Sequence, residues 1–273
     1  MSDNRRLPDF LCLGAPKCGT TWLHELLESH PNVFIPSELK EVHFFDQRFE
    51  KGLDWYSGFF EDAIGDQRVV GEITPNYLYA DPERIKTCES VKKMIIIYRD
   101  PVNRCISHYK FRMRLDNYNG TFDEFLVDYP ESVDWSSYGK HFERYLKVFD
   151  RNQFLVLSFE NATANIEATK KQLSEFLGLC VLRFPETAGQ SKVNQSYKPR
   201  NRVLYKSAVR IAKWMGDFGL YRVRNWLKKS ALTKKLLTNE SQKFDVQIPE
   251  ATRRELGERF VEDQKLFMSL IES

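Results

Sequence analysis

Residues 14–21 have the types and spacing of a loop that binds phosphate or sulfate. The segment reads Gly-Ala-Pro-Lys-Cys-Gly-Thr-Thr, with four residues between its two glycines. Glycines let backbone N–H groups turn toward an anion, and the N-terminus of a following helix adds partial positive charge. The segment is therefore a candidate anion site. Its candidate binding residues are Lys17, Cys18, Gly19, Thr20, Thr21 and Trp22.

The position of the lysine separates this loop from that of kinases and NTPases. In those enzymes the lysine follows the second glycine, and a Ser/Thr and a Walker B aspartate hold Mg²⁺. Here Thr20 follows Gly19, and the lysine of the segment, Lys17, lies inside the loop. Asp100 is better explained as a helix N-cap, because Pro101 follows it. A P-loop kinase or NTPase stays as an alternative, which Mg²⁺ dependence with ATP hydrolysis would favour.

A second group of ionisable residues comprises Glu41, His43 and Asp46. It lies in a segment with many aromatic side chains between residues 44 and 60. A carboxylate among aromatic rings loses hydration, which raises its proton affinity and suits a general base. An exposed charged loop is the alternative interpretation, and for Asp46 the two are equally favoured.

Arg99 and Ser107 form a third candidate pair. Arg99 follows an apolar, β-branched segment over 92–98, and Ser107 lies one to two turns into the helix expected after Pro101. A planar guanidinium and a hydroxyl suit a terminal phosphate, which arginine can bind with two parallel hydrogen bonds. Without the glycine loop, a surface arginine and an ordinary helical serine would be the better interpretation.

Alternating strands and helices must position these residues. This alternation predicts an α/β fold, a P-loop-type parallel sheet flanked by helices. No linker or repeat interrupts the pattern, so we expect one domain over 1–273, with a basic helical C-terminal portion over about 199–273. Residues 31–60 are expected to be irregular and 183–200 to form a long loop. The expected strands are 10–13, 69–70, 92–98 and 153–159, and the expected helices are 20–29, 101–115, 121–128, 137–150, 163–177 and 249–271.

Composition limits the class of protein. The chain has 273 residues, 42% of them hydrophobic, and a net charge of +3, which is too small to indicate a nucleic-acid partner. No apolar run approaches the ~20 residues of a membrane-spanning helix, and no secretory signal is visible. Five cysteines lack metal-ligand spacing, so we expect reduced thiols, no metal and a cytoplasmic location.

Residues 198–235 concentrate positive charge. They hold twelve Lys/Arg and one acid, so their net charge is +11 and that of the remainder is 3 − 11 = −8. Interleaved apolar residues predict basic amphipathic helices. A solvated face is one interpretation. The other is attraction to a phosphorylated cofactor, an acidic glycan or an anionic lipid surface, including peripheral membrane contact. A non-catalytic anion-binding or membrane-surface protein therefore stays as a second alternative.

Three motifs together resemble the sulfotransferases that use 3′-phosphoadenylyl sulfate (PAPS). Residues 15–22 (Ala-Pro-Lys-Cys-Gly-Thr-Thr-Trp) resemble their 5′-phosphosulfate loop, and 98–109 (Tyr-Arg-Asp-Pro-Val-Asn-Arg-Cys-Ile-Ser-His-Tyr) their 3′-phosphate site. Residues 40–46 (Lys-Glu-Val-His-Phe-Phe-Asp) resemble the base-carrying segment of the heparan sulfate 3-O- and N-sulfotransferase branch. The resemblance implies a soluble, bacterial-type enzyme that is independent of metal.

The resemblance also implies roles. Lys17 stabilises the leaving phosphate, Glu41 is the general base, and His43 supports it. The loop residues hold the 5′-phosphate of PAPS, whose product is 3′-phosphoadenosine 5′-phosphate (PAP). Arg99 and Ser107 bind the 3′-phosphate, and a looser match at 194–200 places Lys198 and Arg200 over the nucleotide.

One departure from the family pattern concerns the acceptor. Relatives that modify glycans often carry Glu-Lys-Thr-Pro, where this chain has Glu-Ile-Thr-Pro at 72–75. The loss of that lysine to Ile73 weighs against an acidic glycan. A small molecule, a glycan or a lipid with a hydroxyl or amine therefore remains open as the acceptor, as does the oligomeric state.

Overall fold

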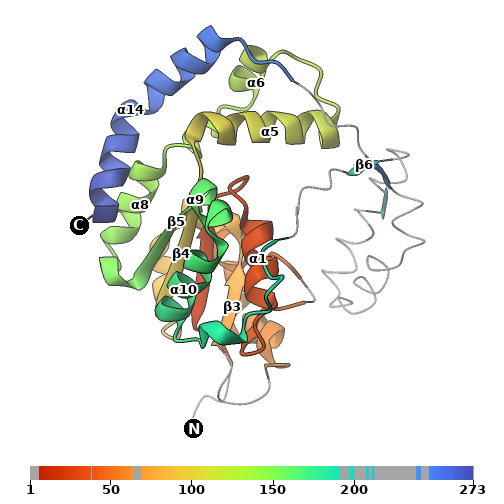
Figure 1. Cartoon of the computed structure of the whole chain (residues 1–273). Coiled ribbons are helices and arrows are strands. Elements are labelled where there is room, and N and C mark those ends of the chain that lie inside the picture. Colours follow the sequence, from red (N-terminus) through yellow and green to blue (C-terminus); the bar gives the residue numbers. More distant parts are fainter. Residues whose placement is uncertain are drawn as a thin grey trace. The chain divides into compact units, whose positions relative to one another are not determined.

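The computed structural model describes residues 6–37, 39–63, 69–190, 197–199, 207–208, 211, 238–240 and 246–272 (Figure 1). Contacts between residues group the chain into two compact units. The first comprises residues 1–108, 121–191 and 248–273, and the second comprises 109–120 and 192–247. The expectation of a single domain stays a prediction, and most of the basic segment 198–235 lies outside the described residues.

A five-stranded parallel sheet forms the centre of the first unit, with strand order β2-β3-β1-β4-β5. All residues of β1 are buried between β3 and β4. Because parallel strands end at the same edge of a sheet, the loops after β3, β1 and β4 lie side by side. The strands are β1 (Phe10–Gly14), β2 (Val33–Phe34), β3 (Val69–Ile73), β4 (Lys93–Tyr98) and β5 (Phe154–Ser158).

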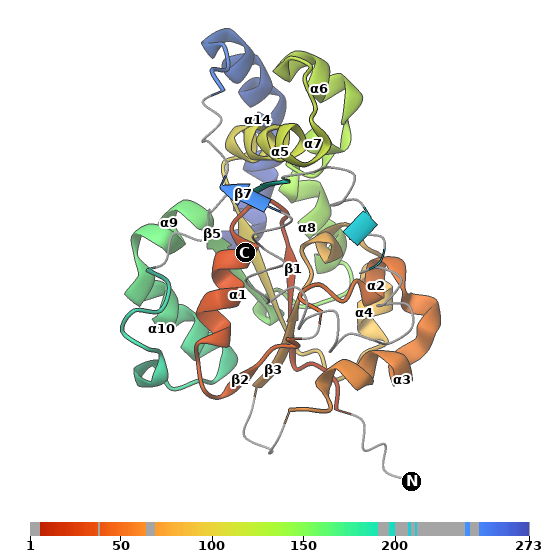
Figure 2. The ribbon, with the colours of Figure 1, turned by 90° about the vertical axis from the view of Figure 1, so that its right-hand side faces the viewer.

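Helices cover both faces of this sheet. Figure 2 shows α1, α9 and α10 on one face, and α2, α3, α4 and α8 on the other. The first group comprises α1 (Thr20–Glu28), α9 (Phe159–Ala164) and α10 (Ile166–Leu177). The second comprises α2 (Phe44–Gln47), α3 (Gly52–Ser57), α4 (Pro82–Lys86) and α8 (Tyr138–Leu146). The predicted α/β class, a parallel sheet flanked by helices, is confirmed.

The described chain contains further helices and strands. The other α-helices are α5 (Pro101–Asp116), α6 (Phe122–Asp128), α7 (Glu131–Asp134) and α14 (Glu250–Glu272). The 3₁₀ turns are η1 (Phe49–Lys51), η2 (Gly58–Phe60), η3 (Pro75–Tyr79), η4 (Arg151–Gln153) and η5 (Val181–Arg183). In the second unit, β6 (Tyr197–Pro199) pairs antiparallel with β7 (Thr238–Glu240).

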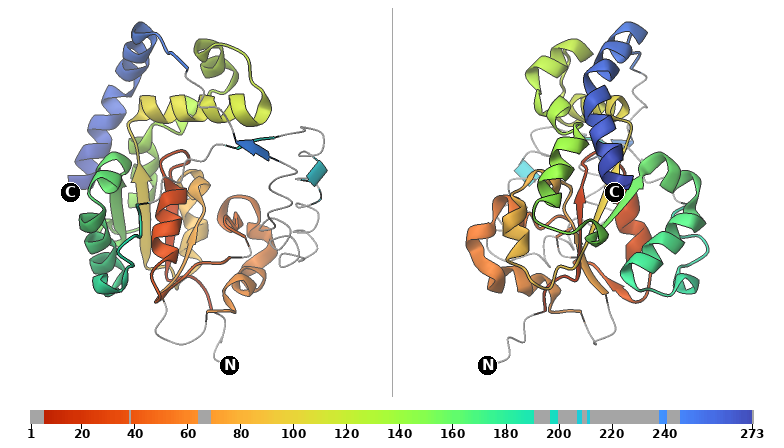
Figure 3. Two further views of the ribbon diagram at one scale, coloured as in Figure 1. Left: turned by 45° about the vertical axis from the view of Figure 1, so that its right-hand side comes forward. Right: turned by 90° about the vertical axis from the view of Figure 1, so that its left-hand side faces the viewer.

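Helix α14 packs against α8, far away in the sequence (Figures 1 and 3). Asp263 on α14 accepts hydrogen bonds from the backbone N–H groups of Gly139 and Lys140, both at 2.9 Å. These N–H groups lie in the first turn of α8 and have no acceptor within that helix. Asp263 therefore caps α8 from another element, and Ser137, the residue before the helix, provides no side-chain cap.

The helix expected over 163–177 is two helices, because Asn165 has a non-helical backbone (φ −125°, ψ 66°) between α9 and α10. The helix expected over 137–150 ends at Leu146. The segment 31–60, expected to be irregular, contains β2, α2 and α3, and β6 lies within the expected loop 183–200. Within the described part of the chain, no helix has the length and apolar character needed to span a bilayer.

Candidate active site

The loop after β1 presents the N-terminus of α1 to the sheet edge. Lys17 has a positive φ of 71°, and Gly19, the residue before the helix, has φ 90°. The first turn of α1 contains no acidic residue and receives no side-chain cap. Its N–H groups and its partial positive charge are therefore not offset by an acidic side chain of the helix itself, which fits the binding of an anion.

Phe159 connects this loop to Arg99. A Cβ added at Gly19 would lie 2.2 Å from the Phe159 ring, so only glycine fits at this contact. The guanidinium of Arg99 lies over the same ring, 5.2 Å from its centroid, and its Nε donates to Glu160 Oε1 at 3.1 Å. The two predicted phosphate-binding elements therefore contact one aromatic ring.

Cys18 is buried beneath the loop, with its Sγ 3.3 Å from the Tyr138 hydroxyl. Burial raises the pKa of its thiol to about 11, although the Tyr138 hydrogen bond and the charges of Arg104 and Arg99 lower it. The thiol is therefore neutral at physiological pH, which argues against a nucleophilic or redox role.

Arg104, a fully buried residue of α5, contacts the glycine loop and is not among the predicted site residues. Its guanidinium donates to Ser136 Oγ at 2.5 Å, to Ser132 O at 2.5 Å and to Pro16 O, within the glycine loop, at 3.4 Å. No carboxylate of a described residue forms an ion pair with it. The helical spacing that aligns Arg104 with the buried residues Pro101 and His108 was the available signal.

The second group of predicted residues forms a chain of charges. His43 Nδ1 lies 2.9 Å from Asp46 Oδ2, and His43 Nε2 lies 3.4 Å from Glu41 Oε2. Burial lowers the pKa of His43, but the hydrogen bonds with Asp46 and Glu41 outweigh it and raise that pKa to about 9. His43 is thus a cation at neutral pH, and it holds the partly exposed Glu41 carboxylate from one side.

Lys40 brings this group to the glycine loop. Its Nζ donates to Thr21 Oγ1, in the first turn of α1, at 2.6 Å. Lys40, which precedes the predicted base Glu41, therefore contacts α1, and the N-terminus of α1 forms the predicted anion site. The structure thus brings together the residues of the first two motifs, and Phe159 adds Arg99 from the third.

The remaining predicted residues lie elsewhere or outside the described part. Trp22 is buried, and its Nε1 donates to Gly189 O at 2.8 Å, so its indole N–H is occupied within the fold. Ser107 is half-buried in the second turn of α5. Lys198 lies in β6, but its side chain and the whole of Arg200 lie outside the described residues.

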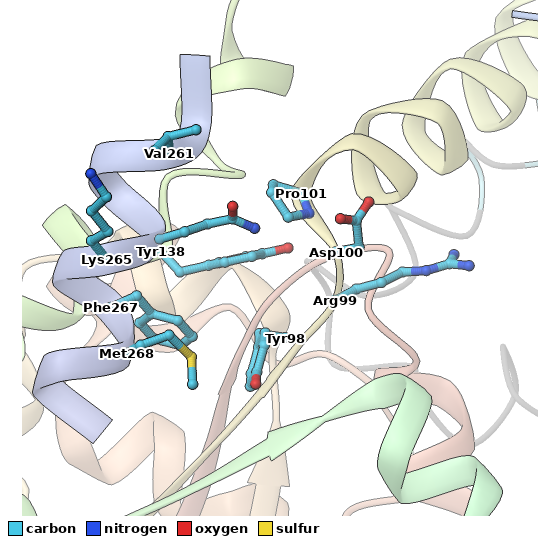
Figure 4. A pocket seen from close by; sticks show the side chains of 10 residues that line it. Tyr98, Arg99, Asp100, Pro101, Tyr138, Val261, Lys265, Phe267 and Met268 are labelled. Atoms are coloured by element: carbon cyan, nitrogen blue, oxygen red, sulfur yellow. The ribbon is translucent and has the colours of Figure 1, made fainter. Parts of the chain in front are cut away.

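A pocket of about 500 Å³ lies on the α14 side of the end of β4. Figure 4 shows Tyr98, Tyr138, Phe267 and Met268 around it, with Arg99 extending away from these side chains. Of the predicted site residues, only Arg99 lines this pocket. Its aromatic walls are continuous with the loop through Tyr138, which contacts Cys18.

Comparison with known proteins shows the family of the chain. The sulfotransferase domain model matches residues 7–207. Human heparan sulfate glucosamine 3-O-sulfotransferase 3B1 is 32% identical over 193 residues, which cover 65% of this chain and 48% of the relative. The membrane-associated sulfotransferase kil1 of Dictyostelium discoideum is 35% identical over 113 residues, which cover 40% of this chain and 24% of that protein.

A solved structure has the same fold. The sulfotransferase of Alicyclobacillus acidocaldarius, at 22% identity, aligns with a TM-score of 0.69 over 98% of this chain and 96% of its own. The family model covers more than half of the chain, so this chain belongs to the sulfotransferase family. It spans about half the length of the 3-O-sulfotransferases that it matches.

Proposed function

We propose that this protein transfers the sulfuryl group of PAPS to a hydroxyl or amine of an acceptor. The observation that carries the proposal is the glycine turn at the N-terminus of α1, with Lys17 inside it and the Glu41–His43–Asp46 group linked to it through Lys40. Membership of the sulfotransferase family and the similarity to 3-O-sulfotransferases support it.

The residues of the loop fit the phosphosulfate end of PAPS. When bound, PAPS supplies a sulfuryl group attached to a phosphate leaving group. The N–H groups at Gly19 to Thr21 and the Thr20 hydroxyl would hold the 5′-phosphate, with Cys18 and Trp22 contributing main-chain contacts. Arg99 and Ser107 would hold the 3′-phosphate, and Lys198 and Arg200 would cover the nucleotide.

Two side chains would carry the chemistry. Glu41 would accept the proton of the attacking hydroxyl, a contribution of typically ~10²–10⁴-fold in rate. The cationic His43, fixed between Glu41 and Asp46, orients that carboxylate. The Lys17 ammonium would neutralise the charge that develops on the leaving phosphate, and it needs no metal ion to do so.

The acceptor is proposed only by class. The 3-O-sulfotransferase relatives are named for heparan sulfate glucosamine. Where glycan-modifying relatives often carry a lysine, this chain has Ile73, which is fully buried in β3. Position 73 therefore offers no positive charge to an acidic acceptor. We propose a small-molecule, glycan or lipid hydroxyl or amine as the acceptor.

Calorimetric titration with PAP tests the nucleotide site. We expect wild-type protein to bind PAP, and Arg99→Ala to weaken PAP far more than adenosine 5′-phosphate, which lacks the 3′-phosphate. The loss for PAP should be on the order of 10-fold to 10²-fold, since a hydrogen bond to a charged group contributes ~1.5–3 kcal/mol. Arg259→Ala, at an exposed i,i+4 pair on α14, is the control. Equal losses for both nucleotides would contradict the assignment of Arg99.

A further inference from the structure

A buried carboxylate lies beneath the segment that carries Glu41 and His43. Glu72, near the end of β3, is fully buried, and it makes no ion pair with a Lys, Arg or His among the described residues. An ionised carboxylate in the interior is costly unless hydrogen-bond donors surround it. The hydrogen-bond donors around Glu72 therefore indicate its role.

Glu72 organises three consecutive backbone N–H groups of the base-carrying segment. Val42 N donates directly to Glu72 Oε1 at 3.0 Å. His43 N donates to Thr74 Oγ1 at 3.4 Å, and that hydroxyl donates to Glu72 Oε1 at 2.5 Å.

The third N–H reaches Glu72 through a tyrosine. Phe44 N donates to the Tyr77 hydroxyl at 2.8 Å, and this hydroxyl lies 2.9 Å from Glu72 Oε1. The hydroxyl of Tyr56 donates to the other oxygen, Oε2. Both tyrosines and Thr74 are buried, so water does not compete for these bonds.

This network demands a group that only accepts hydrogen bonds. Four donors converge on Glu72, from Val42 N–H and the hydroxyls of Tyr56, Thr74 and Tyr77. A carboxylate accepts all four, whereas a glutamine would point its NH₂ at other donors. Burial raises the pKa of Glu72, and the hydrogen bonds from Thr74, Tyr56 and Tyr77 oppose that rise.

The backbone at His43 needs such an anchor. His43 has φ 55° and ψ 38°, a left-handed conformation that costs a non-glycine residue about 1–2 kcal/mol. The N–H groups on both sides of that turn belong to the Glu72 network. The conformation places the imidazole between Glu41 and Asp46.

We propose that Glu72 is a positioning residue for sulfuryl transfer, which fixes the backbone of residues 42–44 and thereby holds Glu41 and His43 in their reactive arrangement. This inference rests on the proposed function through the role of Glu41. The geometry of His43 can nevertheless be measured without any turnover, so the two can fail separately.

The test compares Glu72→Gln with wild type in two measurements. NMR titration of the His43 imidazole should show its pKa falling from about 9 toward the ordinary 6.5, because His43 loses its fixed contacts with Asp46 and Glu41. The kcat for sulfuryl transfer should fall on the order of 10-fold to 10²-fold, the effect of a misplaced reactive group. PAP affinity should stay within about 2-fold, since the Glu72 carboxylate accepts its hydrogen bonds from Val42, Tyr56, Thr74 and Tyr77 and not from the first turn of α1.

A second variant covers the case in which Glu72→Gln fails to fold. Tyr77→Phe keeps the ring and removes only the hydroxyl that joins Phe44 N–H to Glu72, and we expect the same changes with smaller size. Tyr79→Phe is the matched control. Its hydroxyl donates to Trp135 O at 2.8 Å, outside this network, so this variant should leave the His43 pKa and kcat unchanged.

The outcomes separate the two proposals. A folded Glu72→Gln or Tyr77→Phe that keeps the His43 pKa near 9 and the wild-type kcat overturns the role of Glu72. A wild-type protein that binds no PAP and transfers no sulfuryl group overturns the proposed function instead. In that case, a lowered His43 pKa in Glu72→Gln still supports Glu72 as the anchor of residues 42–44.

Discussion

At the scale of single residues, the charge of the His43 imidazole is set by the carboxylate groups that contact it. Glu41 and His43 were expected in one segment, and the structure brings them within 3.4 Å. The charge on His43 depends on Asp46 as well, for which an exposed loop was an equally favoured interpretation. The role of Glu72 was not predictable, because its donors come from residues spread over 42–77.

The raised pKa of His43 predicts a pH-dependent contribution to stability. Its folded pKa of about 9 exceeds the ordinary 6.5, so the protonated imidazole stabilises the folded state. This contribution is full below pH 6.5 and disappears as the pH rises through 9. Urea unfolding of wild type and His43→Gln should therefore show a difference in unfolding free energy that shrinks between pH 6.5 and 9. A difference that stays constant over this range would contradict the charged state of His43.

At the scale of elements, strands and helices followed from local patterns, whereas their partners did not. The strand over 92–98 is visible from its β-branched run. The N-cap of the following helix α5 at Asp100 is confirmed by a 2.8 Å hydrogen bond from Asn103 N. The break at Asn165 was not predicted, because one polar residue inside a periodic apolar pattern is not a strong signal for the end of a helix. The cap of α8 by Asp263 is a long-range contact that no local pattern contains.

Asp263 should contribute measurably to stability through that cap. Asp263→Ala removes the acceptor of two N–H groups at the start of α8, and loss of a capping side chain costs typically about 1 kcal/mol. Thermal or urea unfolding measures this loss. Glu262→Ala, which breaks only an exposed pair with Lys265 on the same helix, should change the unfolding free energy by less than about 0.5 kcal/mol. Equal effects of the two variants would contradict the capping role.

At the scale of the whole molecule, the parallel sheet explains why two of the three distant motifs meet. The loops after β1 and β4, which begin residues 15–22 and 98–109, share one edge, and strand order makes them neighbours. Residues 40–46 follow β2 instead, and the hydrogen bond from Lys40 to Thr21 joins them to α1. The parallel sheet could be expected from the alternation of strands and helices. The order of its strands, which decides which loops are neighbours, is seen only in the structure. The attraction of the basic segment 198–235 to a phosphorylated cofactor, an acidic glycan or an anionic lipid surface stays a prediction, because most of that segment lies outside the described residues.

The most direct measurement is the transfer of ³⁵S from labelled PAPS to fractionated acceptor mixtures by wild type and Lys17→Ala. We predict a labelled product with wild type and a loss on the order of 10²-fold to 10³-fold for the variant, while calorimetry shows that the variant still binds PAP. Lys17→Arg should recover part of the rate. If folded Lys17→Ala transfers the label at the wild-type rate, the ammonium group inside the glycine turn does not stabilise the leaving phosphate.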